Sequence, residues 1–351
     1  MTESYIQENV PLRDLTTFKI GGTARYFCSV DTEQKLKEAV RFAKEKNVQV
    51  VILGGGSNVL ISDEGINALV LKIDIRGITW DSSQTAVTAG AGENWDGLVA
   101  ETVSRGLWGI ENLSGIPGTV GAAPVQNIGA YGTELKDTLA WVEVFDVMDG
   151  AVRKLSREAC RFGYRNSVFK YSGKHLVILR VALQLKKEGS PNLSYKDLKE
   201  YFKSWKEVAP TLVEIRTAVL RIRAEKFPDL KKFGTAGSFF KNPIISLDHF
   251  NQLKKQYPDL PGFEIRGTGE NETNTEPTRN IKVSLAWILD NICGLKGFEK
   301  GGVALFERQP MVLVASEGAS SEEITRFAQK VSAQVKEKTG IDIEWEIQRL
   351  Q

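Results

Sequence analysis

The sequence predicts an α+β fold that is divided into three lobes. A helical pattern starts at Asp31 or Thr32 and is followed by an apolar strand, and this pair defines a first lobe over residues 1–66. Short strand-like segments dominate a second lobe over residues 67–209, and helices return in a third lobe over residues 210–351. With 351 residues the chain is long enough to bury a sizeable core in each lobe.

The elements of the first two lobes follow from residue spacing and turn chemistry. Strands are predicted in VVIL, which runs into the glycine turn GGGSNVL, and in INALVLKI and HLVILRVALQLKK. A helix is predicted in NWDGLVAETVSRGLWG, and the Asp149–Gly150 pair between two apolar runs predicts a β-hairpin. The helix of the first lobe has an apolar face at helical spacing, formed by Leu36, Ala39, Val40 and Ala43.

The third lobe is predicted to begin with a helix between Pro210 and Pro228. Two more helices are predicted in SLDHFNQLKKQYP and KVSLAWILDNICGL. The clearest helix of the chain starts with a capping box made of Ser320 and Glu323 and ends at Gly340.

In the segment IDIEWEIQRL, residues 341–350, apolar and polar side chains alternate strictly from Ile341 to Gln348. This alternation predicts a strand with Glu344 and Glu346 on its polar face. The polar stretch between Gly267 and Asn280 is predicted to be a flexible surface insertion.

Composition and charge narrow the classes of protein. The 46 basic and 44 acidic residues nearly cancel and form no basic block, which argues against a nucleic-acid partner. The N-terminal residues do not resemble a signal peptide and no apolar run is long enough to span a bilayer, so we expect a cytosolic protein without a membrane partner. Cys28, Cys160 and Cys293 are far apart and are predicted to be reduced thiols in the core.

The two histidines limit the chemistry further. Neither His175 nor His249 has a second metal-ligating residue at helical spacing, so we expect neither a zinc site nor a Ser-His-Asp triad. Acid–base chemistry would then depend on Ser, Tyr, Lys, Arg, Glu or Asp.

Two glycine-rich segments suggest a ligand. In GGGSNVL, from Gly54 to Leu60, successive backbone N–H groups could hold a pyrophosphate, although the segment is neither a P-loop nor a Rossmann fingerprint. The uncharged segment from Ser114 to Gly132 offers a second backbone surface, which suits a planar heteroaromatic group. Together they suggest an extended dinucleotide. The alternative is that both are tightly packed loops that only need small residues.

Three polar motifs are candidates for chemistry, each with a simpler alternative. In GSFFKNP, Ser238 could be a shielded proton donor, or it could cap a turn. In GYRNSVFK, Arg165 and Lys170 could hold a carboxylate or phosphate, or they could form surface pairs. Glu346 could be a site carboxylate or a solvated residue on the face of a strand.

The order and spacing of six motifs resemble those of the UDP-N-acetylenolpyruvoylglucosamine reductases, which are flavoenzymes of bacterial cell-wall synthesis. These motifs are GGGSNVL, GIPGTVGAAPVQNIGAYG, GYRNSVFK, LSYKDL, GSFFKNP and IEWEI. LSYKDL and the long third lobe resemble the type I branch of that family. The resemblance covers nearly the whole chain. It implies a two-lobed FAD-binding module of the vanillyl-alcohol-oxidase/PCMH type and a third, α+β substrate-binding domain over residues 210–351, whose C-terminal strand contributes to the active site.

The resemblance also implies a reaction. NADPH reduces non-covalently bound FAD and departs, and UDP-N-acetylglucosamine enolpyruvate then takes its place and receives the hydride, which gives UDP-N-acetylmuramate for peptidoglycan precursor synthesis. By motif, Ser238 is the proton donor, while Arg165 and Glu346 polarise the substrate carboxylate. The implied substrate contacts are Tyr195, Lys226, Asn242 and Gln309. The implied FAD contacts are Gly54, Gly55, Gly56, Ser57, Asn58, Ile116, Pro117, Gly121, Ala122, Val125 and Gly129.

The sequence departs from the family at two points. Ala122 stands where many relatives have serine or glycine. The segment EWEIQ stands where relatives often have a proline and an arginine around the glutamate, so the choice of Glu346 over Glu344 depends on register. Two other functions remain open. One is an FAD-dependent oxidase of sugar alcohols or lactones, although no histidine that could tether FAD precedes His175. The other is a non-catalytic nucleotide-binding protein. We expect the protein to be a monomer.

Overall fold

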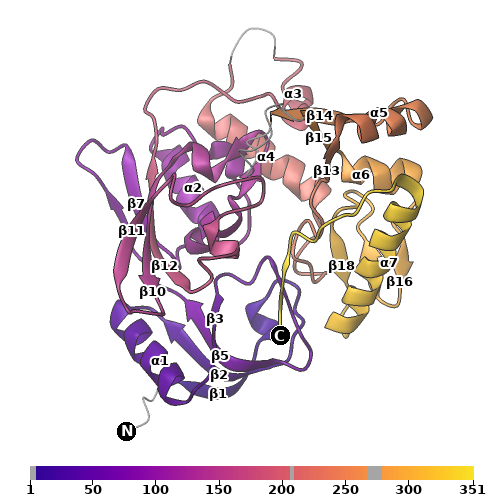
Figure 1. The fold of residues 1–351 in the computed structure, drawn as a ribbon. Helices are drawn as coiled ribbons and strands as arrows, with labels where there is room; N and C mark the ends of the chain where they lie inside the picture. The colour runs from indigo at the N-terminus through magenta and orange to yellow at the C-terminus, as the bar shows by residue number, and fades with distance from the viewer. Residues whose placement is uncertain (1–4, 206–208, 267–278) are drawn as a thin grey trace.

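The computed structural model describes residues 5–205, 209–266 and 279–351. It has the predicted α+β fold, with two lobes that pack together and a third domain beside them (Figure 1). The predicted insertion from Gly267 to Asn280 lies outside the described residues, except for its last two residues.

The first lobe is a four-stranded sheet with one helix. The strand order is β1-β2-β5-β3, in which β1 is antiparallel to β2 and the other pairs are parallel. Thr32 caps the helix by accepting a hydrogen bond from the backbone N–H of Lys35, and the four apolar residues predicted for its inner face are buried. The elements are β1 (Gln7–Pro11), β2 (Thr23–Val30), α1 (Glu33–Glu45), β3 (Val50–Leu53) and β5 (Ile66–Ile73).

The second lobe is an antiparallel sheet of order β11-β10-β12-β7-β6, covered by helices. The predicted hairpin is confirmed, since Asp149 and Gly150 lie between β10 and β11. The uncharged loop has short turns and one small hairpin, β8 (Gly129–Ala130) with β9 (Thr133–Glu134). The other elements are β6 (Ile78–Trp80), β7 (Ala86–Gly90), α2 (Trp95–Ser104), β10 (Leu139–Asp146), β11 (Val152–Ser156), β12 (Leu176–Gln184), α3 (Lys196–Tyr201) and α4 (Leu212–Lys226).

The third domain has two small sheets and a long helix. Ser320 and Glu323 form the predicted capping box of that helix, and Gly340 ends it in the left-handed conformation. Its elements are β13 (Ile244–Ser246), α5 (Leu247–Gln256), β14 (Gly262–Arg266), β15 (Arg279–Val283), α6 (Leu285–Trp287), β16 (Glu299–Lys300), β17 (Val303–Leu305), β18 (Leu313–Ala315) and α7 (Ser321–Thr339).

Two predicted elements of the third domain are wrong in their extent. KVSLAWILDNICGL is not one α-helix, because its first residues belong to β15 and the turn Ile288–Ile292 is a π-helix. The Cys293 N–H bonds to the Ile288 carbonyl, five residues earlier, which widens the turn. The final strand is also shorter than predicted. It is reduced to β19 (Gln348–Leu350), which pairs with the parallel strand β4 (Val59–Ile61) of the first lobe, and to a single antiparallel bridge between Trp345 and Phe240.

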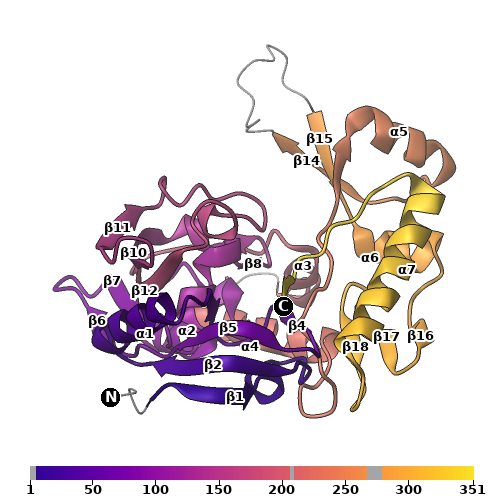
Figure 2. The ribbon, with the colours of Figure 1, turned by 60° about the horizontal axis from the view of Figure 1, so that its bottom comes forward.

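Buried side chains join the three parts. One core contains residues of the first two lobes, including Leu36 and Trp95. Another contains Phe18 and Leu60 of the first lobe together with Phe239 of the third domain. The third domain is therefore packed directly on the first lobe, and the chain returns there at its C-terminus (Figure 2).

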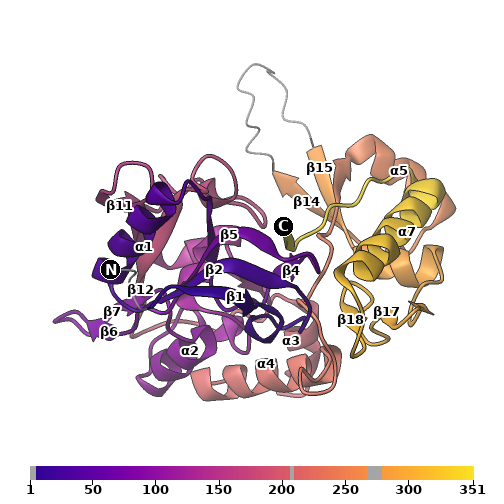
Figure 3. The same ribbon diagram turned by 90° about the horizontal axis from the view of Figure 1, so that it is seen from below.

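The lobe boundaries stay predictions, and the packing favours different positions for them. Strand β5 pairs with both β2 and β3, so the pairing favours a first lobe that extends to Ile73. Helix α4 lies beside α2, where Arg216 forms two hydrogen bonds with Asp96 at 2.6 and 2.8 Å (Figure 3). This packing favours a third domain that starts after Lys226.

Cys28, Cys160 and Cys293 are all buried, as expected. Across the described part of the chain, no helix combines the length and the apolar character needed to cross a membrane. Within residues 5–205, 209–266 and 279–351, no group of three or more His, Cys, Asp or Glu side chains is placed to hold a metal ion.

Candidate active site

A cavity of about 1240 Å³ is lined by residues of both lobes and of the third domain. Each residue that the sequence analysis proposed for catalysis, cofactor binding or substrate binding lines this one cavity. The residues are as far apart in the chain as Gly54 and Glu346, and the pairing of β19 with β4 explains how the two ends meet.

The two glycine-rich loops form one wall of the cavity and pack against each other. A Cβ atom on Gly55 would lie 2.8 Å from the Cα atom of Gly118, so only glycine allows this approach. Gly56 has a φ of +64°, and a Cβ atom there would lie 2.0 Å from the Leu15 carbonyl oxygen. The Ser57 hydroxyl donates a hydrogen bond to the Pro117 carbonyl at 2.9 Å. These glycines thus also meet the requirement of the simpler alternative, close packing of loop on loop.

The cavity also has features of a site for a polar ligand. The Thr119 hydroxyl and the side-chain carbonyl of Gln309 are both buried, and neither has a hydrogen-bond partner among the described residues. Both residues line the cavity. A buried polar group without a partner is costly, and a ligand that bonds to it removes that cost. The uncharged loop and the glycine turn therefore fit a large cofactor with a flat ring and polar edges, such as FAD.

Gly55→Ala is expected to separate the two loops. The added methyl group meets backbone rather than a flexible side chain, so we expect a loss of about 1–3 kcal/mol in stability and at least a tenfold weaker binding of FAD to the apoprotein. Gly97→Ala is the matched control, because a Cβ atom at that position in α2 meets no atom closer than 3.5 Å. Fluorescence titration with FAD and thermal unfolding measure both effects. Equal FAD affinity in the two variants would contradict the role of Gly55.

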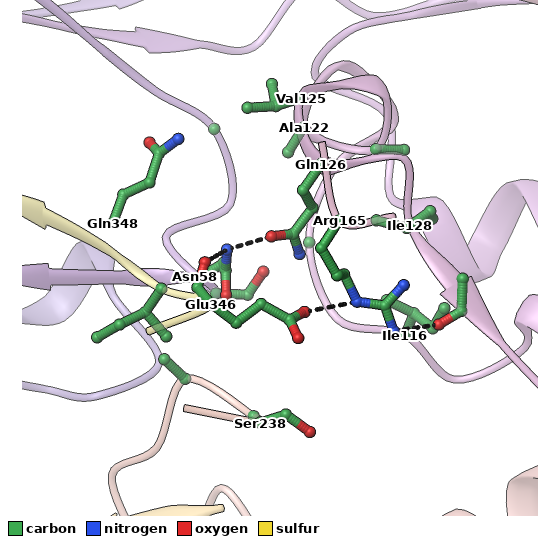
Figure 4. Close-up of a pocket in the computed structure, with 18 of the residues that line it drawn as sticks. Asn58, Ile116, Ala122, Val125, Gln126, Ile128, Arg165, Ser238, Glu346 and Gln348 are labelled. Atoms are coloured by element: carbon green, nitrogen blue, oxygen red, sulfur yellow. Dashed lines mark hydrogen bonds and ion pairs between the residues drawn. The ribbon is translucent and has the colours of Figure 1, made fainter. Parts of the chain in front are cut away.

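Arg165 and Glu346 form an ion pair at the centre of the cavity. The Arg165 Nε atom lies 2.9 Å from Glu346 Oε1, and the two side chains are 19% and 10% exposed. Arg165 Nη2 also donates to the Gly129 carbonyl at 2.7 Å. Burial alone lowers the pKa of Arg165, but the Glu346 carboxylate and other nearby groups outweigh burial and raise the pKa. Figure 4 shows the Glu346 carboxylate pointing toward the guanidinium.

Backbone hydrogen bonds place Glu346 next to the Ser238 segment. The Glu346 N–H bonds to the carbonyl of Phe239 at 2.8 Å, and Asn58 Nδ2 donates to the Glu346 carbonyl at 3.4 Å. Ser238 is half-buried and lines the same cavity. The candidate proton donor and the candidate carboxylate therefore lie on adjacent segments of chain.

Glu344 is placed differently. Its side chain is 75% exposed and pairs with Lys241 at 2.8 Å, whereas Glu346 is 8% exposed as a residue. The expectation that both glutamates share one polar strand face is therefore wrong, because this part of the chain is not a regular strand. Burial and the Arg165 partner favour Glu346 as the site carboxylate.

Three of the four residues proposed to bind substrate already have partners in the protein. Lys226 Nζ lies 2.6 Å from Asp197 Oδ2, and the Tyr195 ring contacts Tyr131 edge to face at 5.3 Å. Asn242 Oδ1 accepts a hydrogen bond from the Leu285 N–H at 3.0 Å. Its side chain also bonds to Tyr164, where it opposes the effect of burial, which raises the pKa of that phenol.

The sequence analysis missed the charge of the cavity. Among the described residues, nine basic side chains line it against five acidic ones. The acidic ones are Glu134, Asp137, Asp197, Glu344 and Glu346, and the basic ones are Lys136, Lys170, Lys174, Lys226, Lys241, Lys282, Arg165, Arg223 and Arg349. This excess of positive charge suits pyrophosphate and carboxylate groups. No sequence signal reveals it, since the basic residues are spread from position 136 to position 349 of a nearly neutral chain.

Comparisons with known proteins agree with this arrangement. Residues 24–156 match the model of an FAD binding domain, and residues 229–350 match the C-terminal domain of UDP-N-acetylenolpyruvoylglucosamine reductase. Curated UDP-N-acetylenolpyruvoylglucosamine reductases from Pseudomonas aeruginosa and Amoebophilus asiaticus are each 37% identical to this chain; the alignments cover 97% of both chains for the first and 99% of both for the second.

A solved structure agrees over the full length. The UDP-N-acetylenolpyruvylglucosamine reductase from Thermus caldophilus has a TM-score of 0.68 and 26% identity, covering 99% of this chain and 100% of its own. The predicted resemblance is confirmed, because the 37% identical relatives are also matched over almost their whole length. The chain belongs to the UDP-N-acetylenolpyruvoylglucosamine reductase family.

Proposed function

We propose that this protein reduces UDP-N-acetylglucosamine enolpyruvate to UDP-N-acetylmuramate, with FAD as cofactor and NADPH as co-substrate. The observation that carries the proposal is the buried Arg165–Glu346 pair, which lies between the glycine-loop wall and the Ser238 segment. The chain also belongs to a family whose named members are reductases of this type.

FAD, when bound, supplies a hydride from NADPH to the methylene carbon of the enolpyruvyl group. The protein must then stabilise negative charge on the substrate carboxylate and protonate the neighbouring carbon. Arg165 has five N–H donors, of which Nε contacts Glu346 and Nη2 contacts the Gly129 carbonyl. Its remaining N–H groups are available to the substrate carboxylate. Ser238 then donates its hydroxyl proton to that carbon, so that the C=C bond becomes CH–CH₃.

The other proposed roles follow from charge and position. Lys226 and Tyr195 bind the diphosphate of the UDP-sugar, with Lys226 exchanging Asp197 for the phosphate. Asn242 donates its NH₂ group, and the buried carbonyl of Gln309 accepts from the substrate. The residues proposed to line the FAD site are the eleven of the glycine-rich loops that were named from the sequence. A cytosolic monomer completes the proposal.

Anaerobic absorption spectra of the FAD-loaded protein test the function. We expect NADPH to bleach the flavin band and stoichiometric UDP-N-acetylglucosamine enolpyruvate to restore it, with UDP-N-acetylmuramate as product. A band that returns only when oxygen is admitted would instead support the oxidase. A protein that does not bind FAD would leave only the nucleotide-binding alternative.

A further inference from the structure

Arg165 has an unusual backbone conformation. Its φ is +53°, in the left-handed region, where a residue other than glycine is strained and persists only when its surroundings hold it. The backbone groups of Gly163 and Asn166 hydrogen-bond to each other on either side of it, at 3.1 and 3.2 Å. From this turn the guanidinium reaches both Glu346 and the Gly129 carbonyl. The position of the guanidinium thus depends on a turn that must be held in place.

Lys170 holds this turn from inside the cavity. It is the last residue of a short 3₁₀ turn, Val168–Lys170, and it lines the cavity. Its Nζ atom donates a hydrogen bond to the Arg165 carbonyl oxygen at 3.1 Å. A hydrogen bond from an ammonium group is about twice as strong as one between neutral groups. The Lys170 side chain therefore contacts the backbone of Arg165 rather than its guanidinium.

We propose that protonated Lys170 is a positioning residue for Arg165, holding its backbone carbonyl so that the guanidinium stays between Glu346 and Gly129. The inference rests on the proposed function, because it assigns Lys170 to the step in which Arg165 stabilises the substrate carboxylate.

The charges around Lys170 make this contact sensitive to pH. Burial, helped by the positive charges of Lys241 and Arg165, lowers the pKa of Lys170 to about 8, against the opposing effect of Glu346 and Glu344. Below that pH the ammonium holds the Arg165 carbonyl. As the pH rises through about 8, the contact becomes that of a neutral amine, and the stabilisation of the substrate carboxylate weakens.

Titration of Lys170 changes the stability of the fold in the opposite direction to the rate. The two measurements therefore distinguish a loss of positioning from unfolding. A lysine whose pKa falls from 10.5 to about 8 on folding binds fewer protons in the folded state between these two values. The contribution of Lys170 to the free energy of unfolding therefore rises with pH in that window. A fall in rate above pH 8 caused by Lys170 is thus accompanied by no loss of stability from the same group.

The experiment measures the rate at which the enolpyruvyl sugar restores the flavin band, after anaerobic bleaching by NADPH, between pH 6.5 and 9.5. In the wild type we expect this rate to fall above pH about 8. Lys170→Met is expected to be roughly tenfold slower at pH 7, with no fall near pH 8. Lys170→Arg should restore most of the rate and keep it at high pH, because a guanidinium stays charged. The exposed Lys187→Met is the control and should match the wild type.

Two results would overturn the inference. One is a rate for Lys170→Met that depends on pH as the wild-type rate does, and the other is a rate for Lys170→Arg that still falls near pH 8. If Lys170→Met does not fold, the pH profile of Lys241→Met tests the inference instead. The positive charge of Lys241 lowers the pKa of Lys170, so its removal must move the fall in rate to higher pH. If the rate of Lys241→Met falls at the same pH as that of the wild type, the inference is overturned. If the enolpyruvyl sugar fails to restore the band in the wild type, the proposed function fails, and the inference falls with it.

Discussion

Ser238→Ala is expected to lower the rate of the enolpyruvyl half-reaction by about 10²–10⁴, the usual contribution of a general acid. Flavin bleaching by NADPH should continue at nearly the wild-type rate, because that step needs no proton from Ser238. Neither histidine can replace Ser238 as proton donor, because neither lines the cavity. The Nε2 atom of His175 lies 3.6 Å from Asp146 Oδ2, and His249 contacts the Thr339 carbonyl.

Single-turnover absorption spectroscopy of both half-reactions measures this effect. Ser332→Ala is a suitable control, because it removes a serine hydroxyl that is buried without a partner in the described part of the chain and that lies in α7, outside the cavity. If Ser238→Ala slowed both half-reactions equally, Ser238 would be supporting the FAD site and would not be the proton donor.

Much of the fold could be predicted because local signals agree with the tertiary packing. Helix α7 has a capping box and a terminal glycine, and both act as their sequence pattern predicts. The hairpin at Asp149 and Gly150 is likewise a local turn. Helix α4 shows the limit of such signals: its start is visible at Thr211, but its partner depends on the Arg216–Asp96 contact across 120 residues.

The site was harder to predict than the fold because its geometry depends on long-range pairing. The alternation in IDIEWEIQRL suggested one regular strand, yet its last residues pair with β4 and Trp345 forms a single bridge with Phe240. Glu346 is buried because its backbone bonds to Phe239 and its side chain meets Arg165, which is 181 residues away in the chain. No periodicity encodes such contacts. The left-handed backbone of Arg165 is equally hidden, since a non-glycine residue gives no sign of it.

Loss of the Glu346 charge is expected to slow the enolpyruvyl half-reaction far more than loss of the Glu344 charge. Glu346→Gln keeps the shape of the side chain but removes the charge that faces a largely buried guanidinium. Loss of one partner of a buried ion pair is strongly destabilising, because the remaining charge is left without compensation. We therefore expect Glu346→Gln to slow the enolpyruvyl half-reaction by about 10²–10³, the range typical of a lost electrostatic contact in a catalytic site.

Glu344→Gln is the matched comparison, since it makes the same change two residues away. Its partner is Lys241, but its side chain is 75% exposed, and exposed ion pairs contribute only about 0–1 kcal/mol. We expect the rate of Glu344→Gln to stay within about threefold of the wild type. Single-turnover rates of the two variants at pH 7 decide between the residues: a larger loss in Glu344→Gln would assign the site carboxylate to position 344, and the Arg165–Glu346 pair would then be structural.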